Sequence, residues 1–329
     1  MRDVCIVTEG AWPARTGGIS TWTQLVLRAL AGADVSVVSL GSAPDGSGEF
    51  TPPPDARDVS LVTDLRRVPE ARVYLASGLD AATALLQTPG VRPERVVYVE
   101  HGDAVREVLA GVALTESGTP LRAYDRLAAA RTIARRRRMI ARACGLTVGV
   151  TPRSVRRARR EGVARARCIP NAVAPVTPAP VTGRRVGFVG RFSTVKGIDR
   201  FVALTGSAYD AVAVGMPSGE PWGDRGISWR QARGCPWEAG DIAALVMPSR
   251  LEASPFAALE AEARGVPVLL SDRADLAESA LVTRLAWSPS RWQRSLDEAL
   301  ARGVSPGLGA RLASARWRRF ERAWRDLCA

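Results

Sequence analysis

Two glutamates, Glu252 and Glu260, lie eight residues apart on either side of a Ser-Pro pair. Ser254 and Pro255 predict a helix start, because a serine oxygen can cap unpaired amides and proline has no N–H to leave without a partner. Alanine, leucine and glutamate favour helix from residue 256 to residue 263. This pattern places Glu260 in the helix and Glu252 on the loop before it.

The predicted helix lies between two short apolar runs, 243–247 and 266–270, which are typical of strands buried in a parallel sheet. A helix N-terminus just beyond a parallel strand binds anions, since its first amides are unpaired and the helix dipole is positive there. The amides of Phe256 and Ala257 would therefore hold a phosphate, and the two carboxylates would accept hydrogen bonds from sugar hydroxyls. Together these groups predict a site for a nucleotide sugar.

A glycine–arginine turn and the only lysine of the chain could supply the positive charge for that site. Gly190 and Arg191 follow the apolar run 186–189, and Lys196 comes five residues after the arginine. A guanidinium binds phosphate as a planar fork and an ammonium as a point charge, so the two groups could wrap a diphosphate.

These segments resemble glycosyltransferase family 4, whose members are retaining enzymes of the GT-B fold. The resemblance is carried by the two glutamates around Ser-Pro, by the following Gly-Val-Pro, and by the arginine and lysine. It implies that Glu252 contacts the transferred sugar, that Glu260 contacts the ribose, and that Arg191 and Lys196 stabilise the leaving group. It also places Gly190, Ser254, Phe256 and Ala257 at the donor.

The single histidine and a glycine pair mark a second place where a ligand could bind. His101 follows a predicted strand at 95–100, and open α/β sheets bind ligands at the carboxyl ends of their strands. Gly17 and Gly18 join a predicted strand at 4–8 to a predicted helix at 19–30, and would let the backbone approach a ligand closely.

The segments TEGAWPARTGGISTW and YVEHGDAVREVLAG contain these residues. They resemble a branch of family 4 that includes the Pel exopolysaccharide glycosyltransferase. The resemblance implies that His101 contacts a sugar hydroxyl, and that the Gly17-Gly18 loop faces the donor diphosphate and the acceptor.

Alternating strands and helices predict an α/β chain of two Rossmann-like domains that face each other across a cleft, as in GT-B. We expect an acceptor domain at 1–175, a nucleotide-sugar donor domain at 176–310, and a crossover helix at 311–329 that packs back on the first domain. Trp317, Phe320 and Trp324 follow helical spacing and predict one apolar stripe on that helix. Further strands are expected at 34–40, 73–76 and 146–150, and further helices at 79–87, 122–143 and 152–161.

The composition fits a cytoplasmic globular protein. At 329 residues and 46% hydrophobic content the chain can form two cores. No stretch approaches the ~20 apolar residues of a membrane span, and the N-terminus enters a strand without a signal peptide. Reduced thiols are expected, with neither a disulfide framework nor a zinc site, because the cysteines are odd in number and scattered. They are Cys5, Cys144, Cys168, Cys235 and Cys328.

The net charge of +13 is confined to one stretch, in which 15 arginines between Arg122 and Arg167 face only Asp125 and Glu161. Solvated helix faces are one explanation. Peripheral contact with an anionic membrane is another, because each basic residue near such a surface adds about 1 kcal/mol. Nucleic acid is not expected, since aromatic side chains are nearly absent from the stretch.

The sequence therefore predicts a retaining glycosyltransferase of the hexosyltransferase type. Its donor would be a nucleotide sugar, UDP-sugar first, and its acceptor a glycan, a lipid-linked molecule or a small molecule. No Asp-x-Asp motif occurs, so no metal and no cofactor beyond the donor are expected. The alternatives are a GT-B nucleotide-sugar epimerase or hydrolase, and a catalytically silent nucleotide-sugar-binding protein, which Ala172 and Ala253 favour because they replace expected glycines.

Overall fold

The computed structural model describes residues 2–9, 18–40, 58–62, 68–109, 123–176, 181, 183–206, 208–215, 226–231, 237 and 240–329. The chain folds as two compact units. Unit 1 contains Met1–Asn171 together with Arg318–Ala329, and unit 2 contains Ala172–Trp317. The domain boundaries expected after residues 175 and 310 stay predictions.

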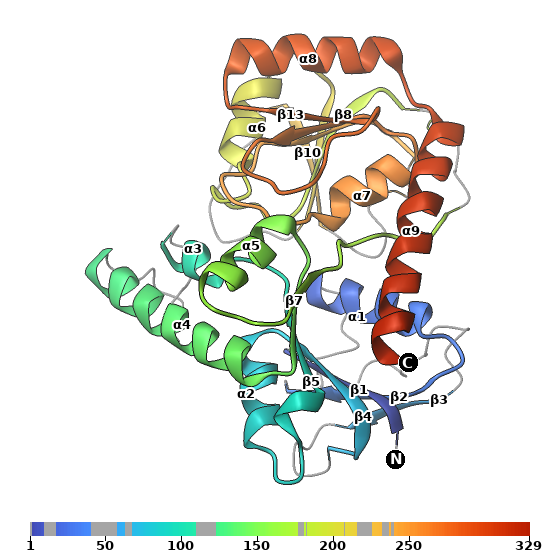
Figure 1. Cartoon of the computed structure of the whole chain (residues 1–329). Helices are drawn as coiled ribbons and strands as arrows, with labels where there is room; N and C mark the ends of the chain where they lie inside the picture. Colours follow the sequence, from blue (N-terminus) through green and yellow to red (C-terminus); the bar gives the residue numbers. More distant parts are fainter. Residues whose placement is uncertain are drawn as a thin grey trace. The chain divides into compact units, whose positions relative to one another are not determined.

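The described strands of unit 1 form a seven-stranded parallel sheet in the order β3-β2-β1-β4-β5-β6-β7 (Figure 1). β1 is an interior strand, because Val4 pairs with Val35 on one side and with Val73 on the other. The strands are β1 (Arg2–Thr8), β2 (Asp34–Ser39), β3 (Asp58–Val62), β4 (Ala71–Ser77), β5 (Val96–Glu100), β6 (Leu146–Gly149) and β7 (Ala166–Cys168).

Helices of unit 1 cover the sheet with apolar faces. Cys5 and Val7 of β1 and Tyr98 of β5 pack in one buried cluster with Leu85 and Ile140, which come from two different helices. The helices are α1 (Gly18–Ala29), α2 (Leu79–Gln87), α3 (Ala104–Leu109), α4 (Ala123–Ala143) and α5 (Pro152–Arg160), and a 3-10 turn, η2 (Pro93–Arg95), precedes β5.

Unit 2 has a six-stranded parallel sheet, within the described residues, in the order β10-β9-β8-β11-β12-β13. Successive residues of its strands belong to different cores, because side chains alternate between the two faces of a sheet. Leu245 packs with α7 and Val246 with α6 and α8. The elements are β8 (Arg185–Val189), α6 (Ile198–Thr205), β9 (Ala211–Gly215), β10 (Ile227–Gln231), β11 (Ile242–Met247), α7 (Phe256–Ala263), β12 (Val268–Ser271), β13 (Val282–Leu285) and α8 (Pro289–Arg302).

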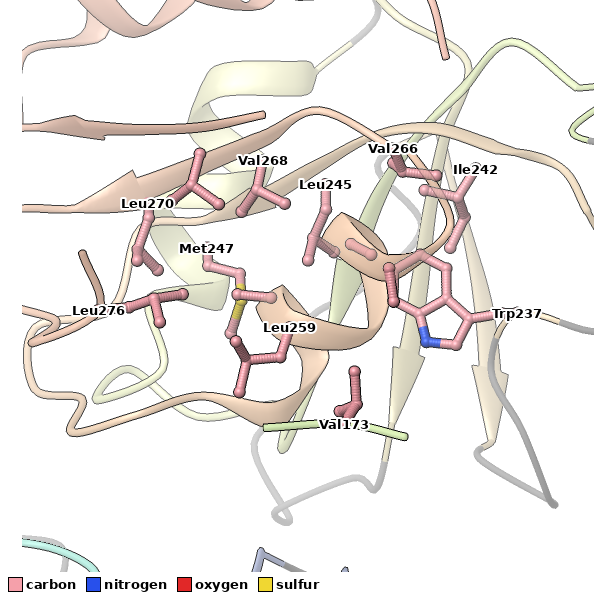
Figure 2. Packing of buried hydrophobic residues seen from close by; sticks show 14 of the residues in the cluster. Val173, Trp237, Ile242, Leu245, Met247, Leu259, Val266, Val268, Leu270 and Leu276 are labelled. Atoms are coloured by element: carbon pink, nitrogen blue, oxygen red, sulfur yellow. The ribbon is translucent and has the colours of Figure 1, made fainter. Parts of the chain in front are cut away.

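Figure 2 shows the core between α7 and the sheet. Leu259 of α7 lies against Leu245 and Met247 of β11, and Val268 and Leu270 of β12 belong to the same cluster. The strands are thus buried on both faces, which explains their continuous apolar runs. The expectation of buried parallel strands on both sides of this helix is confirmed.

The last helix, α9 (Pro306–Cys328), contributes to both units, since the division falls between Trp317 and Arg318. Its C-terminal part packs in unit 1, where the rings of Trp324 and Trp22 lie 5.4 Å apart. Arg325 also donates a hydrogen bond of 2.9 Å to the carbonyl of Ala29. The predicted apolar stripe on this helix is therefore core.

Four described strands, β3, β7, β9 and β10, were not predicted from the sequence. β7 has three residues, too few to show a period, and Ala211–Gly215 contains small residues with weak strand preference. In the part of the chain that the structure describes, no helix has the length and apolarity needed to cross a membrane.

Candidate functional site

Lys196 and Glu252 meet where the strand order of unit 2 reverses. β8 and β11 are neighbours; the chain continues from β8 to β9 on one side and from β11 to β12 on the other. Lys196 lies on the loop that leaves β8, and Glu252 on the loop that leaves β11. Ligands of open α/β sheets bind at the carboxyl ends of such a pair.

The two side chains form an ion pair, with 2.5 Å between Lys196 Nζ and Glu252 Oε2. The other carboxylate oxygen of Glu252 accepts from the amide of Ala253 at 3.3 Å. The side chains are 23% and 13% exposed, so water screens the pair only in part. The resemblance gave the two residues separate roles, and the structure adds that each is the partner of the other.

The backbones of the two loops are also joined. The amide of Arg250 donates to the carbonyl of Val195 at 2.8 Å, and Ser249 Oγ donates to the carbonyl of Lys196 at 3.2 Å. Gly197 has φ +78°, and a Cβ there would lie 2.3 Å from the carbonyl oxygen of Pro248. Only glycine fits this approach, so the Lys196-Gly197 pair fixes the position of the lysine.

Arg191 is the second predicted cation of this site. It follows Gly190 at the end of β8 and is exposed. Among the described residues no acidic side chain pairs with it, which leaves its guanidinium available to an anion. The loop at 216–226, where the family's base-binding segment falls, lies outside the described residues except for Gly226.

The helix after Glu252 begins at Phe256, so Pro255 comes before it and is not its first residue. Pro255 is the N-cap residue of α7, with extended φ −71° and ψ 121°. The prediction that proline is the first helical residue was wrong, because the chain is still extended at the proline. That Ser254 caps the helix stays a prediction. Phe256 and Ala257 are the first helical residues, as expected, and amides in a first turn have no acceptor within the helix.

Glu260 is held by a tryptophan that sequence reasoning missed. Trp237 Nε1 donates to Glu260 Oε2 at 2.9 Å, and Arg264 donates to the carbonyl of Glu260 at 3.0 Å. Burial raises the pKa of the Glu260 carboxyl, while the Trp237 hydrogen bond opposes the rise. In Figure 2 the Trp237 indole lies at the edge of the unit 2 core, near Ile242. Trp237 follows no periodic pattern, so no sequence signal marked it.

Unit 1 has a matching reversal between β1 and β4. Glu9 follows β1, and its carboxylate accepts from the amide of Asp80 at 2.6 Å, at the start of α2. Gly78 after β4 has φ +104°, and a Cβ there would lie 2.3 Å from Glu9 Cδ. Of the predicted glycine pair, Gly18 is the exposed first residue of α1, and Gly17 lies outside the described residues.

His101 follows β5 and lies next to this reversal. Its Nε2 is 2.8 Å from Ser77 Oγ at the end of β4, and its ring meets Trp22 edge-on with centroids 4.7 Å apart. Burial lowers the pKa of His101 to about 3. The ring is therefore neutral at physiological pH and can exchange hydrogen bonds with hydroxyls, but it brings no positive charge.

An ion-pair network fixes the segment that carries His101. Glu100 is 4% exposed and accepts from Arg157 at 2.7 Å, and Arg137 Nη1 lies 3.5 Å from the same oxygen. Arg157 also pairs with Asp103, and Arg137 with Glu161. Burial raises the pKa of Glu100, although both arginines oppose this. Arg137 was expected on a solvated face and is instead 3% exposed.

The predicted residues thus fall into two groups. Unit 2 holds Lys196, Glu252, Arg191 and the start of α7, whereas His101 and Gly18 belong to unit 1. Within the described ranges, no group of three or more histidine, cysteine or acidic side chains is arranged to hold a metal ion.

Comparison with known proteins identifies the fold. A family model described as a domain of unknown function, DUF3492, matches residues 2–83, less than half of the chain. A search of curated proteins finds no match. Sucrose-phosphate synthase from Thermosynechococcus elongatus is 16% identical, with a TM-score of 0.68 over 99% of this chain and 96% of that chain.

Two further structures are similar. WaaG, a glycosyltransferase involved in lipopolysaccharide biosynthesis, is 16% identical, with a TM-score of 0.61 over 97% of this chain and 95% of that chain. AviGT4, a glycosyltransferase involved in avilamycin A biosynthesis, is 15% identical, with a TM-score of 0.61 over 99% of this chain and 97% of that chain. At these identities the likeness shows the fold, and the expected GT-B α/β class is confirmed.

A pH titration tests the environment of His101. Because this is the only histidine, the NMR signals of its two carbon-bound ring protons can be assigned without ambiguity. We expect no titration between pH 5 and 8, since burial places the pKa near 3. The unfolded chain takes up this proton near pH 6.5. The contribution of His101 to folding stability is therefore complete above pH 6.5 and falls as the pH drops toward 3. A midpoint between 6 and 7 in the folded protein would contradict the burial.

Proposed function

We propose that this protein is a retaining glycosyltransferase that moves a sugar from a nucleotide-sugar donor to an acceptor hydroxyl. The observation that carries the proposal is the Lys196–Glu252 pair at the strand reversal of unit 2, where the exposed Arg191 also follows β8. A cation and a carboxylate in contact match the two halves of a nucleotide sugar, which are an anionic diphosphate and a polyhydroxyl ring. The glycosyltransferase fold of the similar structures supports this assignment.

The donor would bind across the loops after β8 and β11. Arg191 and Lys196 would hold the diphosphate together with the first amides of α7, since a helix N-terminus favours phosphate. Glu252 would accept hydrogen bonds from the sugar, and Glu260 from the ribose hydroxyls. When the donor binds, the Lys196 ammonium would pair with the phosphate as well as with Glu252. The Glu252 carboxylate could then accept hydrogen bonds from the sugar.

Transfer would proceed on one face of the sugar. The bond from the anomeric carbon to the leaving phosphate oxygen breaks, and a bond to the acceptor oxygen forms on the same side. The acceptor proton passes to the leaving phosphate. Fixed cations stabilise the charge that develops on such a phosphate, and Arg191 and Lys196 would have this role. His101, neutral and hydrogen-bonded to Ser77, would serve as a partner for a sugar hydroxyl.

The alanines that favoured a silent binding protein cause no strain. No described non-glycine residue has positive φ, so neither Ala172 nor Ala253 occupies a conformation that requires glycine. Membership of family 4 and of the branch with the Pel enzyme, a UDP-sugar donor and hexosyl transfer form part of this proposal. The acceptor would be a glycan, a lipid-linked molecule or a small molecule.

A panel of UDP-, GDP-, ADP- and dTDP-sugars in a thermal-shift assay, followed by product analysis with the best binder, tests the function. We expect one nucleotide class to stabilise the protein, and transfer only when an acceptor is present. Product formation without acceptor would instead indicate an epimerase or hydrolase.

Lys196→Ala should weaken donor binding roughly 10- to 150-fold, the loss of one charge-assisted contact of about 1.5–3 kcal/mol. Arg294→Ala on α8, which is exposed and belongs to neither loop, is the matched control.

Substitution of the two glutamates should separate their roles. Glu260→Gln should weaken free nucleoside diphosphate and sugar donor alike, because both contain ribose. Glu252→Gln should leave diphosphate binding within a few-fold of the wild type but depress turnover, since its partner in the donor is the sugar. Calorimetry and initial rates measure the two effects. Equal effects of both changes on both quantities would refute the division of roles.

Activity should not depend on a divalent metal. Protein cations would neutralise the diphosphate, and no Asp-x-Asp motif is present to hold a metal there. We expect full turnover in excess EDTA, measured against a magnesium-supplemented control. Loss of turnover that magnesium or manganese restores would point to a metal-assisted leaving group.

A further inference from the structure

One face of α4 carries a line of exposed arginines. Arg131, Arg135, Arg138 and Arg142 are spaced by four, three and four residues, and all are exposed. This spacing places them one above another on a single side of a helix. The only acidic residue of α4, Asp125, lies about 100° away from Tyr124 around the helix.

These arginines differ from Arg136 and Arg137 of the same helix, which both have acidic partners. Arg136 pairs with Asp80 at 2.6 Å, and Arg137 lies in the ion-pair network around Glu100. By contrast, none of the described acidic groups forms an ion pair with Arg131, Arg135 or Arg138. The charge on the outer face is therefore not neutralised within the described protein.

Large apolar side chains occupy the same face. Tyr124 is 82% exposed, Leu127 51% and Met139 65%. At 3.6 residues per turn Tyr124 is in line with Arg142, and Leu127 and Met139 lie about 60° to either side of that line. The outer face of α4, made of these three residues and the four arginines, extends about 27 Å along the helix.

We propose that the outer face of α4 docks the protein on an anionic membrane surface. Arginines would bind the lipid phosphates, and the tyrosine, leucine and methionine side chains would enter the boundary between headgroups and acyl chains. Nucleic acid would satisfy the arginines but would leave the aliphatic side chains in water. This binding needs neither donor nor sugar transfer, so it can be tested without a substrate.

The test is co-sedimentation of the full-length protein with phosphatidylglycerol vesicles over a salt series. Phosphatidylcholine vesicles are the neutral control. We expect binding to the anionic vesicles alone, falling as salt rises, because screening acts over about 8 Å at physiological ionic strength. The variant R131S/R135S/R138S should lower the partition coefficient by up to about 100-fold at low salt, the equivalent of about 1 kcal/mol for each arginine.

Two further variants distinguish this face from net charge. R291S/R294S/R302S removes three exposed arginines from α8 and makes the same change in charge, so it should bind within about threefold of the wild type. L127S/M139S should lose roughly 10-fold and keep its salt dependence, since it removes only apolar contact. Circular dichroism confirms that each variant is folded.

Several results would overturn the proposal. They are wild-type protein that stays in the supernatant at low salt, equal losses in the α4 and α8 triple variants, or no loss in L127S/M139S. Binding to a DNA duplex, but not to anionic vesicles, would assign the outer face of α4 to nucleic acid instead.

Discussion

The reversal of strand order beside β8 determines what unit 2 can bind. Two loops leave neighbouring parallel strands toward opposite sides of the sheet, and a space at their carboxyl ends follows from that topology. Hydrogen bonds between the loops and the close contact of Gly197 with Pro248 hold the two loops together. Lys196 and Glu252 can both stay ionised there, because each group is the counterion of the other until a ligand binds.

The two units treat charge in different ways. Around His101 the carboxylates already have partners within unit 1. Glu100 is paired with arginines, and Glu9 accepts a hydrogen bond from the first turn of α2. The histidine itself is neutral. Unit 2 keeps an exposed guanidinium and a lysine whose partner is exchangeable. At the two strand reversals, an anion would therefore be bound in unit 2 and hydroxyl groups in unit 1.

Local sequence was sufficient for the elements with strong period and clear ends. α2 was predicted to the residue, and β5 and α7 to within one, because apolar runs and turn residues mark them. Partners distant in the sequence could not be predicted in this way. Trp237 reaches Glu260 from a segment without periodicity, and the burial of Arg137 depends on Glu100 and Glu161. The arginines of α4 look alike in the sequence, and only the packing of the helix shows which of them are buried and which are exposed.

The sharing of α9 has a consequence for biosynthesis. Trp22 packs against Trp324, so the core of unit 1 contains one residue from the beginning of the chain and one from its end. At about 5–20 residues per second a ribosome needs roughly 10–30 s to add unit 2 and the last turns of α9 after residue 171. During that interval the nascent unit 1 exposes an indole that the finished protein buries completely. The earlier unit to be synthesised is therefore the later one to be completed, and chaperones have a defined apolar surface to hold until the last turns of α9 have been made.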